Sequence, residues 1–232
     1  MISREKPSLL ATFAMAAILF PGTLSGQTIP SPYRFLESRQ EAGLFAGYMS
    51  PGTGRFGFGP GPGPAWGARY GINLSGPFGL EGVVTHIPTT RDIVDPGRVE
   101  GDRVIGEVSS QMVMLDGRLR FSLIGDRVWH GISPFLMTGG GFVFDASNDQ
   151  SDEGLILTDD RFKFGTSVLG MLGGGIRWFP HERFLVRADY ALVLWRLSTP
   201  RGYSDPERAF RGVEEKEWVS GPSYTLGISF RF

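Results

Sequence analysis

The sequence contains no cysteine, which excludes disulfide bonds, thiolate metal sites and a lipid-modified N-terminal cysteine. It has only three histidines and a net charge of -1, so no strong electric field points to a nucleic acid or a highly charged substrate as partner. No run of about 18 consecutive apolar residues occurs, so no membrane-spanning helix is expected. The abundant residues are 34 glycines, 16 prolines and 18 phenylalanines, which favour short strands and turns over long helices.

The N-terminus has the pattern of a secretory signal peptide. A positively charged start precedes an apolar run of 12 residues at positions 9–20, and a Pro-Gly pair ends this run. The run is too short to cross a bilayer as a helix, although an uncleaved anchor is the alternative. Small residues then offer cleavage points. The sequence therefore predicts a signal peptide at 1–26, followed by a short periplasmic lead-in at 27–39.

The last stretch, residues 223–232, alternates strictly between two kinds of side chain. One parity is small or polar. The other parity is wholly apolar and consists of Tyr224, Leu226, Ile228, Phe230 and Phe232. Successive side chains of a strand point to opposite faces, so this strand has one apolar and one polar face. The apolar face could lie under a second sheet in a soluble β-sandwich, or against lipid in a membrane barrel.

Alternating runs of this kind recur along the chain, and their connections decide between the two folds. The runs cover residues 40–49, 64–74, 78–90, 104–123, 132–144, 162–179, 183–197 and 218–232. Long loops and tight turns alternate between them, so every long loop falls at one end. An even number of strands with short turns at one end and long loops at the other is typical of outer-membrane barrels. We predict an all-β fold: a transmembrane, eight-stranded, antiparallel up-and-down β-barrel over residues 40–232.

Charged residues of the runs lie on the parity that would face the barrel interior. These barrel-interior charges are Glu81, Asp116, Arg118, Arg120, Arg177, Arg187, Asp189 and Arg231. A charge on the lipid face near the midplane would cost about 2–4 kcal/mol, whereas inside the barrel acids and arginines can form pairs. Four large apolar residues share the inward parity, Met112, Met114, Leu169 and Met171. Side chains are therefore expected to fill the interior and leave no wide pore.

Six aromatic residues are candidates for the girdles that flank the apolar band of such a barrel. They are Trp66, Tyr70, Trp178, Tyr190, Trp195 and Trp218. Ordinary packing between strands is the other explanation for the same residues.

The eight runs, the alternation of loops and the final strand resemble the small OmpA-type (OmpA/OmpX-like) outer-membrane β-barrels over residues 40–232. The pattern of alternate residues from Tyr224 to Phe232 is similar to the C-terminal signal that the outer-membrane assembly machinery reads in that class. The resemblance implies a protein of the Gram-negative cell envelope, secreted through a cleaved signal peptide and inserted in the outer membrane as a monomer. No peptidoglycan-binding domain follows the last strand, so a wall-tethering role is not expected.

Two other patterns suggest ligand sites and have simpler explanations. Residues 52–57 match G-x-G-x-x-G, but the neighbouring prolines forbid the helix that a dinucleotide site requires. The acidic segment 145–161 could hold a divalent cation, yet Gln150 and Ile156 stand where a calcium loop needs glycine and glutamate. We expect both segments to be solvated loops, and no cofactor or metal site is predicted.

An enzyme has to be considered because lipid A deacylases are eight-stranded barrels with a Ser/His/acid site. The histidines are His86, His130 and His181, with Ser133 and Glu182 as candidate neighbours at the turn end. No motif links them, so no catalytic residue is assigned.

The function that the sequence favours is structural or interaction-based. The external loops would contact lipopolysaccharide or an external partner, and the barrel wall would contact outer-membrane lipid. A narrow channel and a lipid-modifying enzyme are the alternatives.

Overall fold

The structure is a computed structural model that describes residues 31–35, 39–147, 154, 156–205, 208 and 210–232. Pro32–Phe232 forms one compact unit. The predicted signal peptide, 1–26, and most of the predicted lead-in, 27–39, lie outside the described residues. No helix in the described ranges is long and apolar enough to cross a membrane.

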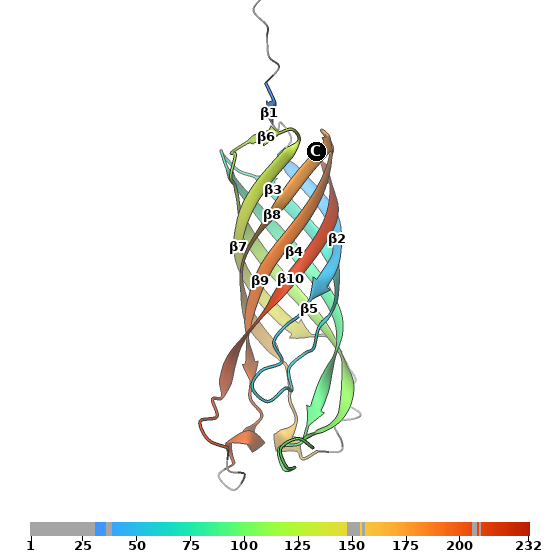
Figure 1. Cartoon of the computed structure of the whole chain (residues 1–232), viewed down its shortest axis with the longest axis vertical. Helices are drawn as coiled ribbons and strands as arrows, with labels where there is room; N and C mark the ends of the chain where they lie inside the picture. The colour runs from blue at the N-terminus through green and yellow to red at the C-terminus, as the bar shows by residue number, and fades with distance from the viewer. Residues whose placement is uncertain (1–30, 36–38, 148–153, 155, 206–207, 209) are drawn as a thin grey trace, which may run out of the picture. The chain divides into compact units, whose positions relative to one another are not determined.

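Eight long antiparallel strands form the wall of a closed barrel (Figure 1). Each strand pairs with its neighbour in the chain, and the first and last close the ring because Tyr224 of the last strand lies opposite Tyr48 of the first. The strands are β2 (Gln40–Met49), β3 (Gly63–Asn73), β4 (Phe78–Val94), β5 (Val104–Ser122), β7 (Ile132–Asp145), β8 (Thr166–His181), β9 (Phe184–Ser198) and β10 (Lys216–Arg231). The predicted all-β, eight-stranded, up-and-down barrel is confirmed.

The two ends of the barrel differ in their connections. We call the end with the connections β3–β4, β5–β7 and β8–β9, together with residues 40 and 232, the turn end; it is at the top in Figure 1. We call the opposite end, with the long connections β2–β3, β4–β5, β7–β8 and β9–β10, the loop end. Two short 3-10 helices, η2 (Thr158–Asp160) and η3 (Arg201–Ser204), belong to the loop end.

Two short strands at the turn end differ from the expectation. The strand β1 (Tyr33–Phe35) lies in the predicted lead-in and pairs with β6 (Arg127–Trp129), which lies in the connection after β5. The sequence predicted no strand in 27–39 and a short turn at residues 125–127. Three residues are too few to show an alternation, and each of these strands depends on hydrogen bonds to the other.

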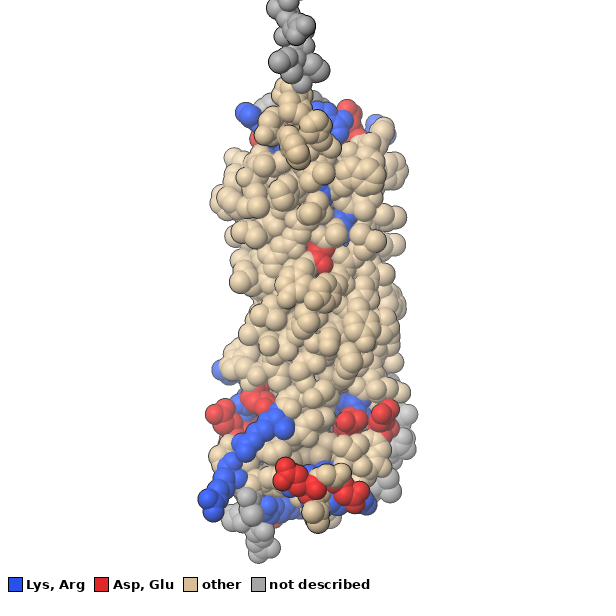
Figure 2. All heavy atoms as spheres, in the orientation of Figure 1, with Lys and Arg blue, Asp and Glu red and all other residues tan. Residues whose placement is uncertain are grey.

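The outer wall of the barrel is apolar. Figure 2 shows a broad zone almost without charged side chains between the charged residues of the two ends. The wall exposes apolar residues from every long strand, including Leu44, Trp66, Val84, Leu115, Leu136, Leu172, Leu192 and Leu226. Such a surface would be unstable in water and suits the hydrocarbon of a membrane.

The interior of the barrel has two chemically different halves. Charged side chains occupy the turn-end half. Apolar side chains fill the loop-end half and include Met49, Met112, Met114, Val143, Leu169, Met171, Val193 and Trp195. The four apolar residues predicted to point inward are among them.

The burial of Trp195 corrects one expectation. Its side chain is 0% exposed and belongs to the apolar half of the interior, not to an outer girdle. It shares its parity with Val193 and Leu197, which are also buried, while Arg196 points outward. The other five girdle candidates, Trp66, Tyr70, Trp178, Tyr190 and Trp218, are exposed on the outer wall.

Candidate functional site

The turn-end half of the interior contains a network of buried ion pairs. The structure places all eight predicted interior charges there, with exposed fractions between 1% and 7%: Glu81, Asp116, Arg118, Arg120, Arg177, Arg187, Asp189 and Arg231. They come from β4, β5, β8, β9 and β10, so strands far apart in the sequence meet in one cluster.

Two glutamates lie at the centre of the network. Arg120 donates from Nη1 to Glu41 Oε1 at 2.8 Å and also to Glu81 Oε1. Arg187 donates from Nη1 to the same Glu81 oxygen at 2.6 Å, and Arg177 donates from Nη2 to Glu41 Oε2. Each glutamate therefore accepts hydrogen bonds from two arginines and connects strands across the barrel interior.

Further pairs extend the network. Asp189 accepts from Arg187 Nε at 2.6 Å and from Arg69 Nη1 at 2.6 Å. Asp116 accepts from Arg118 on the same strand. Removing a single partner from such a buried set leaves a desolvated charge without compensation, which is far more costly than breaking a surface pair.

Two members of the network, Glu41 and Arg69, were not assigned from the sequence. Glu41 shares its parity with Gly43, Phe45 and Gly47, so neither parity of β2 was clearly the lipid face. Arg69 lies on the parity opposite the outward aromatic residues Trp66 and Tyr70. The rule that charges on the non-lipid parity point inward would therefore have assigned it to the interior. The inward position of Glu41 becomes evident only in the closed barrel, where Arg120 and Arg177 lie beside it.

Glycines provide the space that these large side chains need. A Cβ atom on Gly79 would lie 2.7 Å from Arg120 Nη2, and one on Gly71 would lie 3.1 Å from Glu41 Cγ. Both positions face the interior in the register of β3 and β4. The high glycine content thus serves the network as well as the turns.

Aromatic side chains from the loops pack over the loop end of the interior. The ring centroids of Phe58 and Phe162 are 4.7 Å apart, those of Phe56 and Tyr203 are 4.6 Å apart, and Phe210 lies 5.4 Å from Tyr203. Burial, and secondarily the nearby carboxylate of Asp160, raises the pKa of Tyr203 to about 12. The sequence did not predict this packing, because contacts between separate loops leave no periodic signal.

The filled interior predicts that the protein does not conduct ions appreciably. Apolar side chains fill the loop-end half, and ion pairs between opposite strands cross the turn-end half. In planar bilayers we expect no conductance above a solvent leak. Replacing the fully buried Trp195 by alanine tests the role of the apolar half. This variant should increase the leakage of ions through the barrel, because it removes a large side chain from the interior. A steady single-channel conductance of the wild type would contradict the prediction.

Basic side chains line two hollows on the outside of the loop end. The first, about 330 Å³, lies on the outer wall of β8–β10 and includes Arg196, Lys216 and Trp218; the Arg196 guanidinium carbon lies 4.6 Å from the Trp218 ring centroid. The second, about 380 Å³, is lined by residues of the connections β7–β8 and β9–β10 and by Ser198. Its charged residues are Arg161, Lys163, Arg201 and Asp159. Figure 2 shows a run of Lys and Arg atoms at the loop end.

The three histidines occupy separate places. His86 lies on the outer wall, with its ring 4.8 Å from the Trp66 ring in an edge contact. His130 and His181 are exposed at the turn end. Ser133 is buried on the inner face and its hydroxyl hydrogen-bonds to Ser122 at 3.1 Å. The wall of the barrel thus separates His86 from this serine.

The two loops considered as ligand sites show neither a dinucleotide-binding motif nor a metal centre among their described residues. Residues 52–57 form turns, with Gly54 and Gly57 at positive φ, and no helix follows them. Much of the acidic segment 145–161 lies outside the described residues. Among those that the structure describes, no group of three or more His, Cys, Asp or Glu could hold a metal ion.

Comparison with known proteins gives likeness in structure only. No family model and no curated protein sequence matches the chain. The crystal structure of Neisserial surface protein A, NspA, has a TM-score of 0.53 and 9% identity, over 83% of this chain and 97% of that one. The outer-membrane protein OprG from Pseudomonas aeruginosa has a TM-score of 0.52 and 13% identity, over 84% of this chain and 97% of that one.

These similarities, at low identity, concern the fold. Both comparison proteins align over nearly their whole length with this chain. The similarity in backbone structure agrees with the closed antiparallel barrel of this chain. The chain therefore has the fold of the small outer-membrane β-barrel proteins, as its resemblance to the OmpA-type class indicated.

Proposed function

We propose that this chain is an integral protein of the cell outer membrane whose loop end binds lipopolysaccharide, and that its role is structural or interaction-based and not enzymatic. The observation that carries the proposal is the position of the basic hollows. They lie at the loop end, at the border of the apolar wall. Five basic residues, Arg161, Lys163, Arg196, Arg201 and Lys216, line them, with Asp159 as the acidic residue.

The chemistry of the first hollow suits a phosphorylated lipid. Arg196 and Lys216 can donate hydrogen bonds to phosphate oxygens. Trp218 and Val168 belong to the same hollow and can contact acyl chains. Tryptophan also favours the border between the hydrocarbon and the polar headgroups. A lipid with a phosphorylated sugar headgroup in the outer leaflet would satisfy both kinds of contact.

Calorimetric titration of the detergent-folded protein with lipopolysaccharide tests this proposal. The double variant Arg196→Gln/Lys216→Gln should lose at least about tenfold in affinity, because two charge-assisted hydrogen bonds are removed. The matched control is Arg98→Gln/Arg211→Gln, which removes two exposed arginines elsewhere at the loop end. Equal affinities of the two double variants, or equal binding of dephosphorylated lipopolysaccharide by the wild type, would contradict the proposal.

The other two candidate functions have less support. The filled interior disfavours a narrow channel. The separation of the histidines disfavours a lipid-modifying enzyme, and mass spectrometry of lipid A with and without the protein tests that candidate directly.

The C-terminal strand carries a separate proposal about assembly. Its outward row, Tyr224, Leu226, Ile228, Phe230 and Phe232, is exposed on the wall. We propose that the assembly machinery of the outer membrane reads this row. The variant Phe232→Ser should then lower the amount of protein in the outer membrane several-fold, while refolding of the purified chain in detergent stays nearly unchanged. Phe78→Ser, an exposed aromatic at the same end, is the control. Equal losses in cells for both variants would contradict the proposal.

A further inference from the structure

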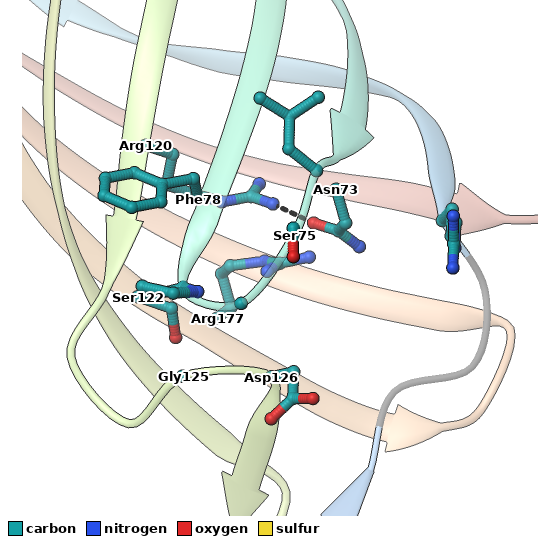
Figure 3. Close-up of a pocket in the computed structure, with 12 residues that line it drawn as sticks. Asn73, Ser75, Phe78, Arg120, Ser122, Gly125, Asp126 and Arg177 are labelled. Carbon is teal, nitrogen blue, oxygen red and sulfur yellow. Dashed lines mark hydrogen bonds between the residues drawn. The ribbon is translucent and has the colours of Figure 1, made fainter.

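The turn end contains a cavity that the ion-pair network does not fill. Its volume is about 380 Å³, at the lower end of the range for small-molecule sites. Residues of the β3–β4 turn, the connection after β5 and the inner wall line it (Figure 3). Its charged lining residues are Arg39, Arg120, Arg177 and Asp126. The cavity is therefore predominantly basic, and it lies at the opposite end of the barrel from the proposed lipopolysaccharide site.

The buried charges around this cavity do not balance. Among the described residues, and leaving Arg231 aside, five buried arginines occupy the turn-end half of the interior against four buried carboxylates, an excess of one positive charge. The arginines are Arg69, Arg118, Arg120, Arg177 and Arg187, and the carboxylates are Glu41, Glu81, Asp116 and Asp189. A desolvated positive charge is costly without a negative partner, so this half of the barrel favours an added anion.

Arg177 has donor capacity to spare at the cavity. Its Nη2 donates to Glu41, whereas its buried Nε has no hydrogen-bond partner among the described residues. Arg120, in contrast, already donates to Glu41, Glu81 and Asn73. Arg177 and Ser75 both line the cavity (Figure 3).

We propose that this cavity binds a small oxyanion, a phosphate or a carboxylate, that enters from the turn end. The planar fork of an arginine matches the oxygens of both groups. The hydroxyl of Ser75 lines the cavity and supplies a further donor. Bound there, the anion compensates part of the buried positive charge. The site uses the spare donors of Arg177 and leaves the ion pairs of Glu41 and Glu81 in place.

The test is a titration of the detergent-folded full chain with sodium phosphate, and separately with sodium acetate, at constant ionic strength set by sodium chloride. Line broadening in the ³¹P spectrum reports phosphate binding, and the midpoint of thermal unfolding reports both anions. The key variant is Ser75→Asp, which adds a carboxylate to the cavity lining and removes no member of the ion-pair network. Arg39→Gln removes an exposed lining arginine. Arg183→Gln, an exposed arginine at the same end that does not line the cavity, is the matched control.

We expect saturable binding of at least one anion by the wild type and by Arg183→Gln, with affinities within about twofold of each other. Ser75→Asp should lose at least tenfold, and Arg39→Gln should lose less. Saturation by phosphate alone identifies a phosphate site, and saturation by acetate identifies a carboxylate site. Absence of saturable binding of both anions by the wild type, or equal affinities of the wild type and Ser75→Asp, would overturn the proposal.

Discussion

Replacing Glu81 by glutamine is expected to lower the free energy of unfolding by about 3–5 kcal/mol, the range for breaking a buried ion pair. Glu81 is 2% exposed, and its Oε1 accepts from both Arg120 and Arg187. The substitution keeps the shape of the side chain but removes the negative charge between two guanidinium groups. Both arginines are almost fully buried in the folded barrel, so water compensates little of the repulsion between them.

Unfolding in urea, followed by the gel shift between heated and unheated samples, measures this loss. The matched control is Glu107→Gln, which removes an exposed carboxylate from the same sheet on β5 and should cost less than about 1 kcal/mol. The double variant Glu81→Gln/Arg120→Gln should cost clearly less than the sum of the two single changes, because it removes both charges of one pair. Equal stabilities of Glu81→Gln and Glu107→Gln would show that the network is not essential to the fold.

The second large effect is expected on the outer wall. Leu172 is 65% exposed and lies midway along β8 in an outward row with Val168, Ile176 and Trp178. The variant Leu172→Arg should lower the free energy of unfolding in lipid vesicles by about 2–4 kcal/mol, the cost of an arginine at the bilayer midplane. The cost arises because the hydrocarbon offers no hydrogen-bond acceptor to the guanidinium group.

Two controls separate the effect of lipid from the effect of the substitution itself. Leu172→Met keeps the surface apolar and should be nearly neutral. Leu157→Arg introduces the same side chain at an exposed position of the β7–β8 connection, and it should also cost little. Urea titration followed by tryptophan fluorescence measures all three variants. If Leu172→Arg and Leu157→Arg cost the same, the wall of the barrel does not face hydrocarbon.

Much of the fold was predictable because the two faces of a barrel strand lie in different environments, which require different side chains at alternate positions. The run at residues 40–49 coincides with β2, and the other seven predicted runs match long strands with small shifts at their ends. Lipid on one side and a filled interior on the other force a period of two over ten or more residues. The short strands β1 and β6 escaped detection because three residues cannot establish a period.

The parity of a strand was predictable only where the two faces differed clearly. In β9, Trp195 was assigned outward from its residue type, although it shares its parity with Arg187 and Asp189, which were assigned inward. In β2, Glu41 shares its parity with two glycines and a phenylalanine, so the sequence does not show which face of this strand is inward. The inward position of Glu41 is stabilised by Arg120 and Arg177, which approach it only when the barrel closes. Residue type alone thus predicts the direction of a side chain less well than its parity does. Parity in turn predicts it less well than the knowledge of which residue the side chain pairs with.

Local alternation and the spacing of turns are enough to predict the all-β class, the eight strands, the unequal ends and the inward parity of eight charged residues. Which charges meet, where the aromatic loop residues pack, and where the basic hollows and the turn-end cavity lie all depend on the closure of the ring. Hydrogen bonds between β2 and β10 join the two ends of the barrel sequence, and this bends the sheet until side chains more than 100 residues apart, such as Arg187 and Glu81, come into contact.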